Sequence, residues 1–264
     1  TLPNPNYQSQ IRAIHLATGI PSWRRDLPTA AGWISAPAYH DGRIYVTQRK
    51  SSAAIDSAQL LCLNARLGSQ LWTTGSPNNE EPLRWPPTIA EDSLFLNGGR
   101  YTGIFSYDRE TGGQNFFSPI EELNATWTPS YYNGHLYFLK GGLLHQYDAT
   151  TGALDWAVAI ENTWADVRPA VTSGAAIFIH PSYPLYELIC FDVTTQQERW
   201  RVATGFIGAP AVAGARVYAF DTEGRVNVYD LATGTLLQTY ANGTWGSGEQ
   251  GLIVTSDALI ACDA

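Results

Sequence analysis

Hydrophobic and polar residues alternate along most of this chain in short runs that end at turns. The run GLLHQYD at 142–148 is one example, and alternation with a period of two is typical of a half-buried β-strand. RIYVTQ (43–48) and HLYFLK (135–140) follow Asp-Gly and Asn-Gly pairs, which are strong short-range signals of a β-hairpin. RVYAFD (216–221) follows Ala213-Gly214 in the same way. The pattern predicts an all-β protein of antiparallel hairpins.

A ten-residue motif recurs along the chain, and its clearest copy is YDATTGALDW at 147–156. The other copies are IHLATGIPSW (14–23), LNARLGSQLW (63–72), YDRETGGQNF (107–116), FDVTTQQERW (191–200) and YDLATGTLLQ (229–238). Their start-to-start spacings are 49, 44, 40, 44 and 38 residues. Such spacings are typical of β-propeller blades, each of which is a four-stranded sheet.

Each copy predicts a strand, a tight turn and a second strand. The Asp of D-x-x-T-G can accept backbone N–H bonds within the turn, and the Gly can adopt a positive φ. The aromatic residue four positions later, such as Trp156, is expected to pack between one unit and the next. Two more strands precede each copy, and the first opens near a proline, which is tolerated at a strand start. These prolines are Pro37, Pro87, Pro129, Pro169 and Pro210.

The two ends of the chain each carry part of a unit. The first copy has no hairpin before it, and the segment 251–264 stops where a further turn would begin. Joining the N- and C-terminal strands in one shared blade would close the ring and remove a free sheet edge. This predicts a six-bladed propeller. Seven blades stay open, because 258–263 and 11–16 resemble the same strand of the unit.

Composition narrows the class of protein. The chain has 264 residues, of which 44% are hydrophobic and 15% charged, and the repeat predicts a single domain over 1–264. The net charge is −8 and the basic residues are scattered singly, so we expect no nucleic-acid partner. No apolar run is long enough to predict a membrane span. The three cysteines and five histidines show no metal-ligand spacing, so no metal site is predicted.

The motif x-D-x-x-T-G-x-x-x-W resembles the repeat of the quinoprotein-dehydrogenase-like propellers. That superfamily includes the pyrroloquinoline quinone (PQQ) alcohol dehydrogenases and the BamB-type outer-membrane assembly factors. The resemblance implies a propeller of PQQ-like repeats and an extracytoplasmic location. Some copies are degenerate, since His15 and Asn64 replace the Asp, Gln196 replaces the Gly and Gln238 replaces the Trp.

The enzymes of that superfamily have features that this sequence does not match. They are eight-bladed, stack the quinone on a ring of adjacent disulfide-bonded cysteines, and hold calcium with a Glu, an Asn and an Asp. No two cysteines are adjacent here, and no calcium set can be assigned. We therefore expect no cofactor and no catalytic activity.

A candidate binding surface is predicted where the segments between units converge around the channel mouth. Aromatic faces among carboxylates suit a cation or a sugar ring. A residue repeated once per unit also fits a packing role, so both interpretations stay open. The candidate residues are Trp33, Trp85, Trp127, Trp164, Phe206, Trp245, Arg84, Arg168 and Glu249.

The sequence thus predicts a non-catalytic recognition or assembly module that binds a protein partner. A small-ligand or carbohydrate sensor that uses the channel mouth is the second hypothesis. A degenerate quinoprotein oxidoreductase is the third. Two segments outside the repeat, RKSSAAIDSA (49–58) and HPSYPLY (180–186), are candidate sites for a protein partner.

Overall fold

A computed structural model describes residues 9–27, 33–49, 58–75, 86–97, 103–120, 128–160, 168–182, 185–241, 250–255 and 259–263. The described residues form strands and turns, with no helix among them. They fall into two compact units, Thr1–Pro129 and Ser130–Ala264, and each unit is described by itself. The predicted pairing of the two chain ends involves both units and stays a prediction, as does the single domain.

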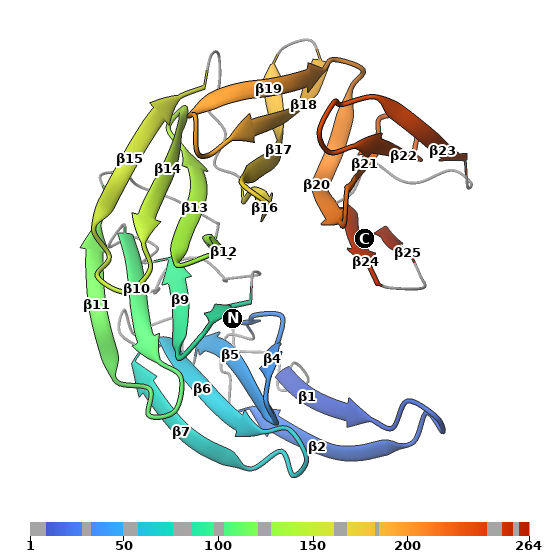
Figure 1. Ribbon diagram of the computed structural model, residues 1–264. Coiled ribbons are helices and arrows are strands. Elements are labelled where there is room, and N and C mark those ends of the chain that lie inside the picture. Colours follow the sequence, from blue (N-terminus) through green and yellow to red (C-terminus); the bar gives the residue numbers. More distant parts are fainter. Residues whose placement is uncertain are drawn as a thin grey trace, which may run out of the picture. The chain divides into compact units, whose positions relative to one another are not determined.

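The first unit contains three antiparallel sheets (Figure 1). A hairpin sheet is formed by β1 (Ser9–Ile14) and β2 (Pro21–Leu27). The second sheet contains β3 (Trp33–Ile34), β4 (Ala38–His40), β5 (Arg43–Arg49), β6 (Ala58–Asn64) and β7 (Gln70–Gly75), with β3 and β4 both paired to β5. The third contains β8 (Thr88–Ala90), β9 (Ser93–Asn97), β10 (Gly103–Asp108) and β11 (Gln114–Pro119).

The second unit contains three four-stranded sheets and a hairpin sheet. The first sheet contains β12 (Ser130–Tyr132), β13 (His135–Lys140), β14 (Leu143–Asp148) and β15 (Leu154–Ala159). The next contains β16 (Ala170–Thr172), β17 (Ala175–Ser182), β18 (Leu185–Asp192) and β19 (Gln197–Val202). The third contains β20 (Phe206–Ala213), β21 (Arg216–Asp221), β22 (Arg225–Asp230) and β23 (Leu236–Ala241), and the hairpin contains β24 (Gln250–Val254) and β25 (Leu259–Asp263).

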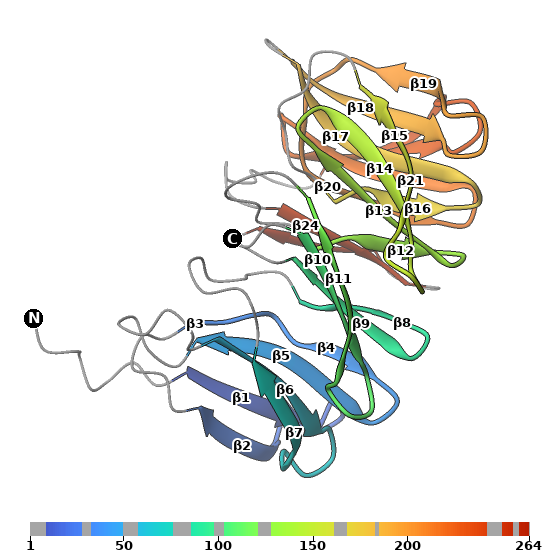
Figure 2. The ribbon, with the colours of Figure 1, turned by 90° about the vertical axis from the view of Figure 1, so that its left-hand side faces the viewer.

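Strand order within each four-stranded sheet follows chain order, which is the topology of a propeller blade and confirms the predicted fold class. The strands can be followed in a second view (Figure 2). In the second unit the first strands of the sheets, β12, β16, β20 and β24, contact one another in that order. The predicted prolines open these strands, except that Pro210 lies inside β20, where the pairing with β21 is irregular between Ile207 and Ala211.

The C-terminal hairpin corrects the sequence-based strand count. Residues 259–263 form β25, which pairs with β24. Strand β25 therefore corresponds to the second strand of a four-stranded repeat. The segment 11–16 contains the end of β1, which runs into the D-x-x-T-G turn and corresponds to a third strand. The described strands at the two ends therefore correspond to different strands of the repeat, β24 and β25 to its first and second and β1 and β2 to its third and fourth.

The hydrophobic core lies between neighbouring sheets because alternate residues of each second strand face opposite sides. In β17, Ile177 packs with Val217 of the following sheet, whereas Phe178 packs with Tyr137 of the preceding one. All four side chains are buried. Burying an aliphatic or aromatic side chain of this size contributes about 1.5–3 kcal/mol, so one alternating strand joins three sheets.

The predicted hairpin turns have the expected backbone. Asp41 and Gly42 have φ values of 44° and 75°, and Asn133 and Gly134 have 48° and 82°. Two consecutive positive φ values define the type I′ turn that Asp-Gly and Asn-Gly favour. The third turn differs by one position, because it is formed by Gly214 and Ala215, with Gly214 at φ 58°.

Candidate functional site

The two ends of each four-stranded sheet differ in what they carry. In this topology the connections from first to second strand and from third to fourth strand leave one end, which we call the turn edge. The other connections leave the opposite end, which we call the loop edge. The turn edge holds the hairpin turns and the D-x-x-T-G motifs, so the sequence repeat mostly specifies that edge.

The repeated aspartates at the turn edge are turn caps. Asp148 Oδ1 accepts hydrogen bonds from Thr150 N at 3.0 Å, Thr151 N at 2.7 Å and Thr151 Oγ1 at 2.8 Å. The equivalent bonds recur at Asp108 and Asp230. These bonds favour the charged form, and they lower the pKa of all three carboxyl groups below the ordinary 3.8. These carboxylates act within the turn and have no catalytic geometry.

The repeated tryptophans pack between neighbouring sheets, as predicted. The indole Nε1 of Trp23 donates to the carbonyl of Ala65 at 2.8 Å, and that of Trp200 donates to Leu231 at 2.9 Å. Trp72 donates to Arg109 in the same way at 3.2 Å. The accepting residue always follows the cap position of the next copy, so these contacts belong to the scaffold.

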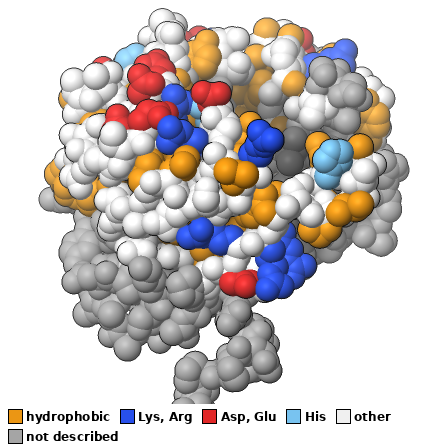
Figure 3. All heavy atoms as spheres, turned by 90° about the horizontal axis from the view of Figure 1, so that it is seen from below, with side chains coloured by type: hydrophobic (Ala, Val, Ile, Leu, Met, Phe, Trp, Pro, Cys, Tyr) orange, Lys and Arg blue, Asp and Glu red, His pale blue; other side chains and the backbone are white. Residues whose placement is uncertain are grey.

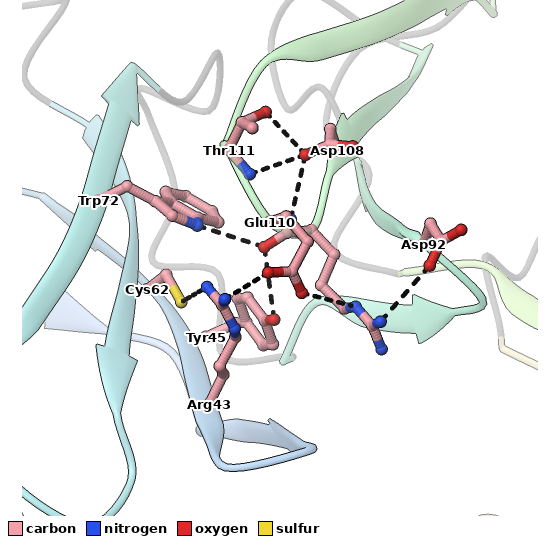
Figure 4. A network of polar contacts seen from close by, with 9 residues as sticks. Arg43, Tyr45, Cys62, Trp72, Asp92, Asp108, Glu110 and Thr111 are labelled. Atoms are coloured by element: carbon pink, nitrogen blue, oxygen red, sulfur yellow. Dashed lines mark hydrogen bonds and ion pairs between the residues drawn. The ribbon is translucent and has the colours of Figure 1, made fainter.

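One charged network joins two sheets of the first unit at the turn edge (Figure 4). The guanidinium of Arg43 lies between the thiol of Cys62, at 4.0 Å from Sγ, and the carboxylate of Glu110. Arg109 reaches Glu110 at 3.8 Å and Asp92 at 3.5 Å. Because each of these cations has an acid beside it, the network holds the sheets together and offers no unpaired charge to a ligand.

The loop edge of the second unit carries polar side chains that sequence reasoning missed. The sixth residues of β13, β17 and β21 are Lys140, His180 and Asp221, and all three are buried. The sequence does contain a signal for these residues, because each is a charged or titratable residue at the end of an apolar run. A buried polar group must be satisfied by partners, and Asp221 shows how this is done.

Asp221 is the acceptor of a local network. Its carboxylate accepts hydrogen bonds from Glu223 N at 3.0 Å, Arg225 N at 2.9 Å, Arg225 Nε at 2.7 Å and Asn227 Nδ2 at 2.8 Å. Burial by itself raises the pKa of Asp221, but the bonds from Arg225 and Asn227 outweigh it, and the pKa lies below 3.8. The turn after β21 is thus closed by a structural carboxylate.

The segment 180–186 extends one hairpin at the loop edge. Strands β17 and β18 have eight residues each, against six for β13 and β14, and their added pairs include Pro181 with Tyr186. Tyr186 is exposed. Behind it, Glu187 lies 3.9 Å from His180 Nδ1 and forms an ion pair with Arg201. The described part of the predicted excursion, 180–182 and 185–186, therefore lengthens the β17–β18 hairpin, and residues 183 and 184 lie outside the described residues.

Arg168 is the predicted site residue that the structure describes best. It precedes β16, and its Nε donates to Ser130 Oγ on β12 at 3.2 Å. Ser130 Oγ in turn donates to the carbonyl of Pro169. Burial lowers the pKa of Arg168 below its ordinary 12.5.

Two other predicted site residues, Trp33 and Phe206, lie among the described residues. Trp33 lies in β3, with its backbone opposite Arg49. Phe206, the first residue of β20, is fully buried and lies edge-on to the ring of Tyr229, with ring centroids 6.0 Å apart. Phe206 is therefore a core residue. The remaining candidates lie outside the described residues: Trp85, Trp127, Trp164, Trp245, Arg84 and Glu249.

Neither Cys62 nor Cys190 has the environment of a reactive thiol. Cys62 and Cys190 are free and buried, and burial raises the pKa of both, to about 12 for Cys190. In the part of the chain that the structure describes, no group of three or more His, Cys, Asp and Glu side chains could hold a metal ion. No described helix is long and apolar enough to cross a membrane.

The repeats, the four-stranded sheets and the tryptophan contacts together define a β-propeller of PQQ-like repeats. A family model described as outer membrane protein assembly factor BamB matches residues 8–234 and 140–263. The chain therefore belongs to this BamB family. No curated protein sequence matches it.

Solved structures share the fold at low sequence identity. BamB from Moraxella catarrhalis is 17% identical, with a TM-score of 0.68 over 93% of this chain and 75% of that protein. Sqt1 from Saccharomyces cerevisiae is 13% identical, with a TM-score of 0.70 over 97% of this chain and 76% of that one. Quinohemoprotein alcohol dehydrogenase from Comamonas testosteroni is also 13% identical, with a TM-score of 0.69, and this chain covers 59% of it. At these identities the likeness shows the propeller fold alone.

Proposed function

We propose that this protein is a non-catalytic recognition module that binds a protein partner. Its membership of a family described by an assembly factor supports a role in protein interaction. Fold alone does not carry a function, so the partner surface is argued from the described residues.

The observation that supports the proposal is the composition of β23. The six outermost strands are β2, β7, β11, β15, β19 and β23, and five of them contain a charged residue, a proline or a glycine. β23 reads LLQTYA and contains none of these. Its Leu236 and Leu237 are each 52% exposed and Tyr240 is 39% exposed. Charges and prolines normally protect an edge strand from pairing, and β23 contains neither, so only the register shift near Leu237 interrupts this edge.

The geometry of β23 suits an added strand. It pairs with β22 on one side and ends its sheet on the other, where no described strand pairs with it. Leu236 lies opposite Tyr229 of β22, and Leu237 follows it at a register shift in the β22–β23 pairing. An extended partner segment could use the main-chain groups of the edge and cover the exposed apolar side chains of Leu236, Leu237 and Tyr240. Because β23 has no charge, the segment we propose is uncharged and apolar.

On the one face drawn in Figure 3, the described basic side chains form no comparable surface. On the face seen in Figure 3, Lys and Arg side chains stand in separate small groups among hydrophobic and acidic ones. A protein segment therefore fits the described surface better than a nucleic acid does.

The test is binding of a capped, fluorescently labelled peptide with the sequence of β23, measured by anisotropy. We expect saturable binding, and we expect Leu236→Lys to weaken it at least tenfold because a lysine on the edge opposes strand addition. The matched control is Leu154→Lys on β15, where the equivalent leucine is 53% exposed but Asp155 already protects the strand. Equal binding by wild type and Leu236→Lys, or no binding of any uncharged extended peptide, would reject this surface.

The channel mouth is a second proposed surface, because aromatic residues recur in the segments between sheets. It would be the binding surface if the protein is a small-ligand or carbohydrate sensor. A ligand that binds only the folded state raises the melting midpoint, so a thermal-shift screen is the direct test. Trp85→Ala and Trp127→Ala should abolish such a shift. If both variants fail to fold, these tryptophans are packing residues.

The oxidoreductase hypothesis rests on fold analogy with the quinohemoprotein dehydrogenases, of which the chain covers 59%. It predicts a new absorbance band when PQQ and calcium are added to the purified protein. We expect no such band, and its appearance would overturn the non-catalytic proposal.

A further inference from the structure

The residue before each repeated proline departs from the repeat at one position. Four of these prolines directly precede β4, β8, β12 and β16, so the residue before each lies at the loop edge, whereas Pro210 and Ala209 lie inside β20. The residues at this position are Ala36, Pro86, Thr128, Arg168 and Ala209. Arg168 is the only charged residue of the set. The other repeats have no charged residue at this position, so the repeat itself does not require the charge of Arg168.

The guanidinium of Arg168 is anchored on one side. Its Nε donates to Ser130 Oγ at 3.2 Å. The Ser130 hydroxyl donates its own proton to the carbonyl of Pro169, so only its acceptor capacity faces the arginine. Because the guanidinium is planar and rigid, fixing Nε also fixes the direction of the fork formed by Nη1 and Nη2.

The fork of Arg168 has no protein acceptor among the described residues. No hydrogen bond from Nη1 or Nη2 and no ion pair to a described carboxylate is formed, whereas Arg43, Arg201 and Arg225 each have a carboxylate partner. Arg168 itself is half-buried, and neither Nη atom is among the described buried polar atoms that lack a partner. The group remains a cation at neutral pH, because arginine is not deprotonated in proteins.

We propose that Arg168 is a receptor for a carboxylate, which it binds end-on through Nη1 and Nη2 while Ser130 holds Nε. Two parallel N–H···O bonds to the two oxygens of one carboxylate are the arrangement that the guanidinium fork matches best. The part-buried setting strengthens the contact relative to a pair in open water.

A carboxylate fits this site better than a phosphate does. A phosphate carries up to two charges and is usually held by several cations or by a nest of backbone N–H groups. Arg168 offers one charge and one planar fork. The carboxylate could belong to a free organic acid or to the C-terminus or an acidic side chain of a protein. The chemistry at Arg168 is the same for both sources.

This inference does not depend on the strand-addition surface. Arg168 and β23 belong to different sheets of the second unit, and the variants that test one leave the other unchanged. Failure of the β23 peptide to bind would therefore leave the carboxylate site standing, and the reverse also holds.

The test is the melting midpoint of the full chain in sodium acetate or sodium succinate, against sodium chloride at equal ionic strength. A single pair of this kind predicts a dissociation constant on the order of 1–10 mM. At about ten times that constant we expect the midpoint to rise by about 3 °C. Arg168→Gln should remove the rise, and Arg168→Lys should retain less than half of it, because lysine keeps the charge but loses the fork.

Two controls make the result specific. Arg216→Gln removes one exposed arginine of the same unit and should leave the rise intact. Ser130→Ala keeps the arginine but frees its Nε, and should weaken carboxylate binding several-fold. If Arg168→Gln does not fold, Ser130→Ala and Arg168→Lys still decide the question, because both retain a cation at the site.

The two carboxylate sources are separated by a short N-acetylated peptide with either a free or an amidated C-terminus. A rise with the free form alone assigns a peptide carboxylate, whereas a rise with succinate alone assigns a free acid, and either result supports the site. An equal rise in wild type and Arg168→Gln, no rise with any carboxylate, or a larger rise with inorganic phosphate would overturn the proposal.

Discussion

The indole of Trp200 lies directly against Gly234 of the next copy of the repeat. A Cβ atom placed on Gly234 would lie 2.7 Å from Cδ2 and 2.8 Å from Cγ of Trp200. Gly234 also has φ 70°, so two constraints act at one position. The same contact joins Trp23 to Gly68 and Trp72 to Gly112, which explains why the motif pairs a glycine with a tryptophan.

Replacing Gly234 with alanine should destabilise the protein by about 2–4 kcal/mol. About 1 kcal/mol comes from the left-handed backbone, and the rest comes from displacing a packed indole. The matched control is Gly214→Ala, which has φ 58° but no neighbouring atom within 4 Å of the added Cβ. Gly214→Ala should lose only the part of the free energy of unfolding that comes from the left-handed backbone, about 1 kcal/mol. Urea unfolding of both variants measures the difference, and equal losses would show that the Trp200 contact has no steric role.

The caps at Asp108, Asp148 and Asp230 should make stability depend on pH. Each has a folded-state pKa below the ordinary 3.8, so its stabilisation is present above that value and is lost as pH falls through the lower folded-state pKa. The variant with all three replaced by Asn should lose less stability than wild type between about pH 6 and about pH 3. Chemical unfolding at both pH values measures this.

The chain contains a natural precedent for that substitution. Asn64 occupies the cap position of its copy, and its Oδ1 accepts from Arg66 N at 2.9 Å and from Leu67 N at 3.0 Å. An amide oxygen therefore makes the backbone bonds without a titrating group. Asn64→Asp is the reverse control and should steepen the acid loss. A pH dependence that is identical in wild type and the triple variant would assign acid sensitivity to other carboxylates.

Most of the scaffold could be predicted from sequence because local chemistry specifies it. Asp-Gly at 41–42 and Asn-Gly at 133–134 favour a backbone that few other pairs adopt, and the motif glycine is needed beneath an indole. Gln196 shows the limit of this reasoning. It replaces the motif glycine, yet it adopts φ 57°, so the surrounding sheet imposes the turn on a residue that does not favour it.

The candidate site was predicted less well, because burial at the loop edge is decided by packing between sheets. Phe206 has the sequence context of a mouth residue, but it is fully buried beside Tyr229. Lys140 and His180 close apolar runs, yet nothing local in the sequence says that they lie inside. The sequence identifies Arg168 as a candidate because it is a charged residue just before the first strand of a sheet. Its anchor, Ser130, is 38 residues away, so the contact could be found only in the fold.

The buried thiols should report unfolding. Burial raises the pKa of Cys62, and it raises that of Cys190 to about 12, so neither forms much thiolate at about pH 8. In a Cys262→Ala variant we expect a thiol reagent to react slowly with the folded protein and quickly with both cysteines in denaturant. Cys190→Ala in the same background should remove half of the signal. Fast reaction of two thiols in the folded protein would contradict the burial of Cys62 and Cys190.

Asp221 should matter more for stability than the half-buried caps Asp108, Asp148 and Asp230 do, although all four are carboxylates that accept hydrogen bonds in turns. It is buried and receives bonds from two backbone N–H groups and two side chains, including the guanidinium of Arg225. Asp221→Ala removes all four acceptor contacts and leaves buried donors unpaired. We therefore expect a loss of about 2–4 kcal/mol, since part of Arg225 remains in solvent.

The comparison variants separate charge from hydrogen bonding at this turn. Asp221→Asn keeps one acceptor oxygen but presents an amide to Asn227 and loses the charge opposite Arg225, so its loss should fall between those of wild type and Asp221→Ala. Asp230→Ala removes a half-buried cap whose bonded N–H groups lie near solvent, and it should cost much less than Asp221→Ala, because water can satisfy the freed N–H groups. Thermal and urea unfolding give the order directly. If Asp230→Ala proved as costly as Asp221→Ala, burial would not be what distinguishes the two carboxylates.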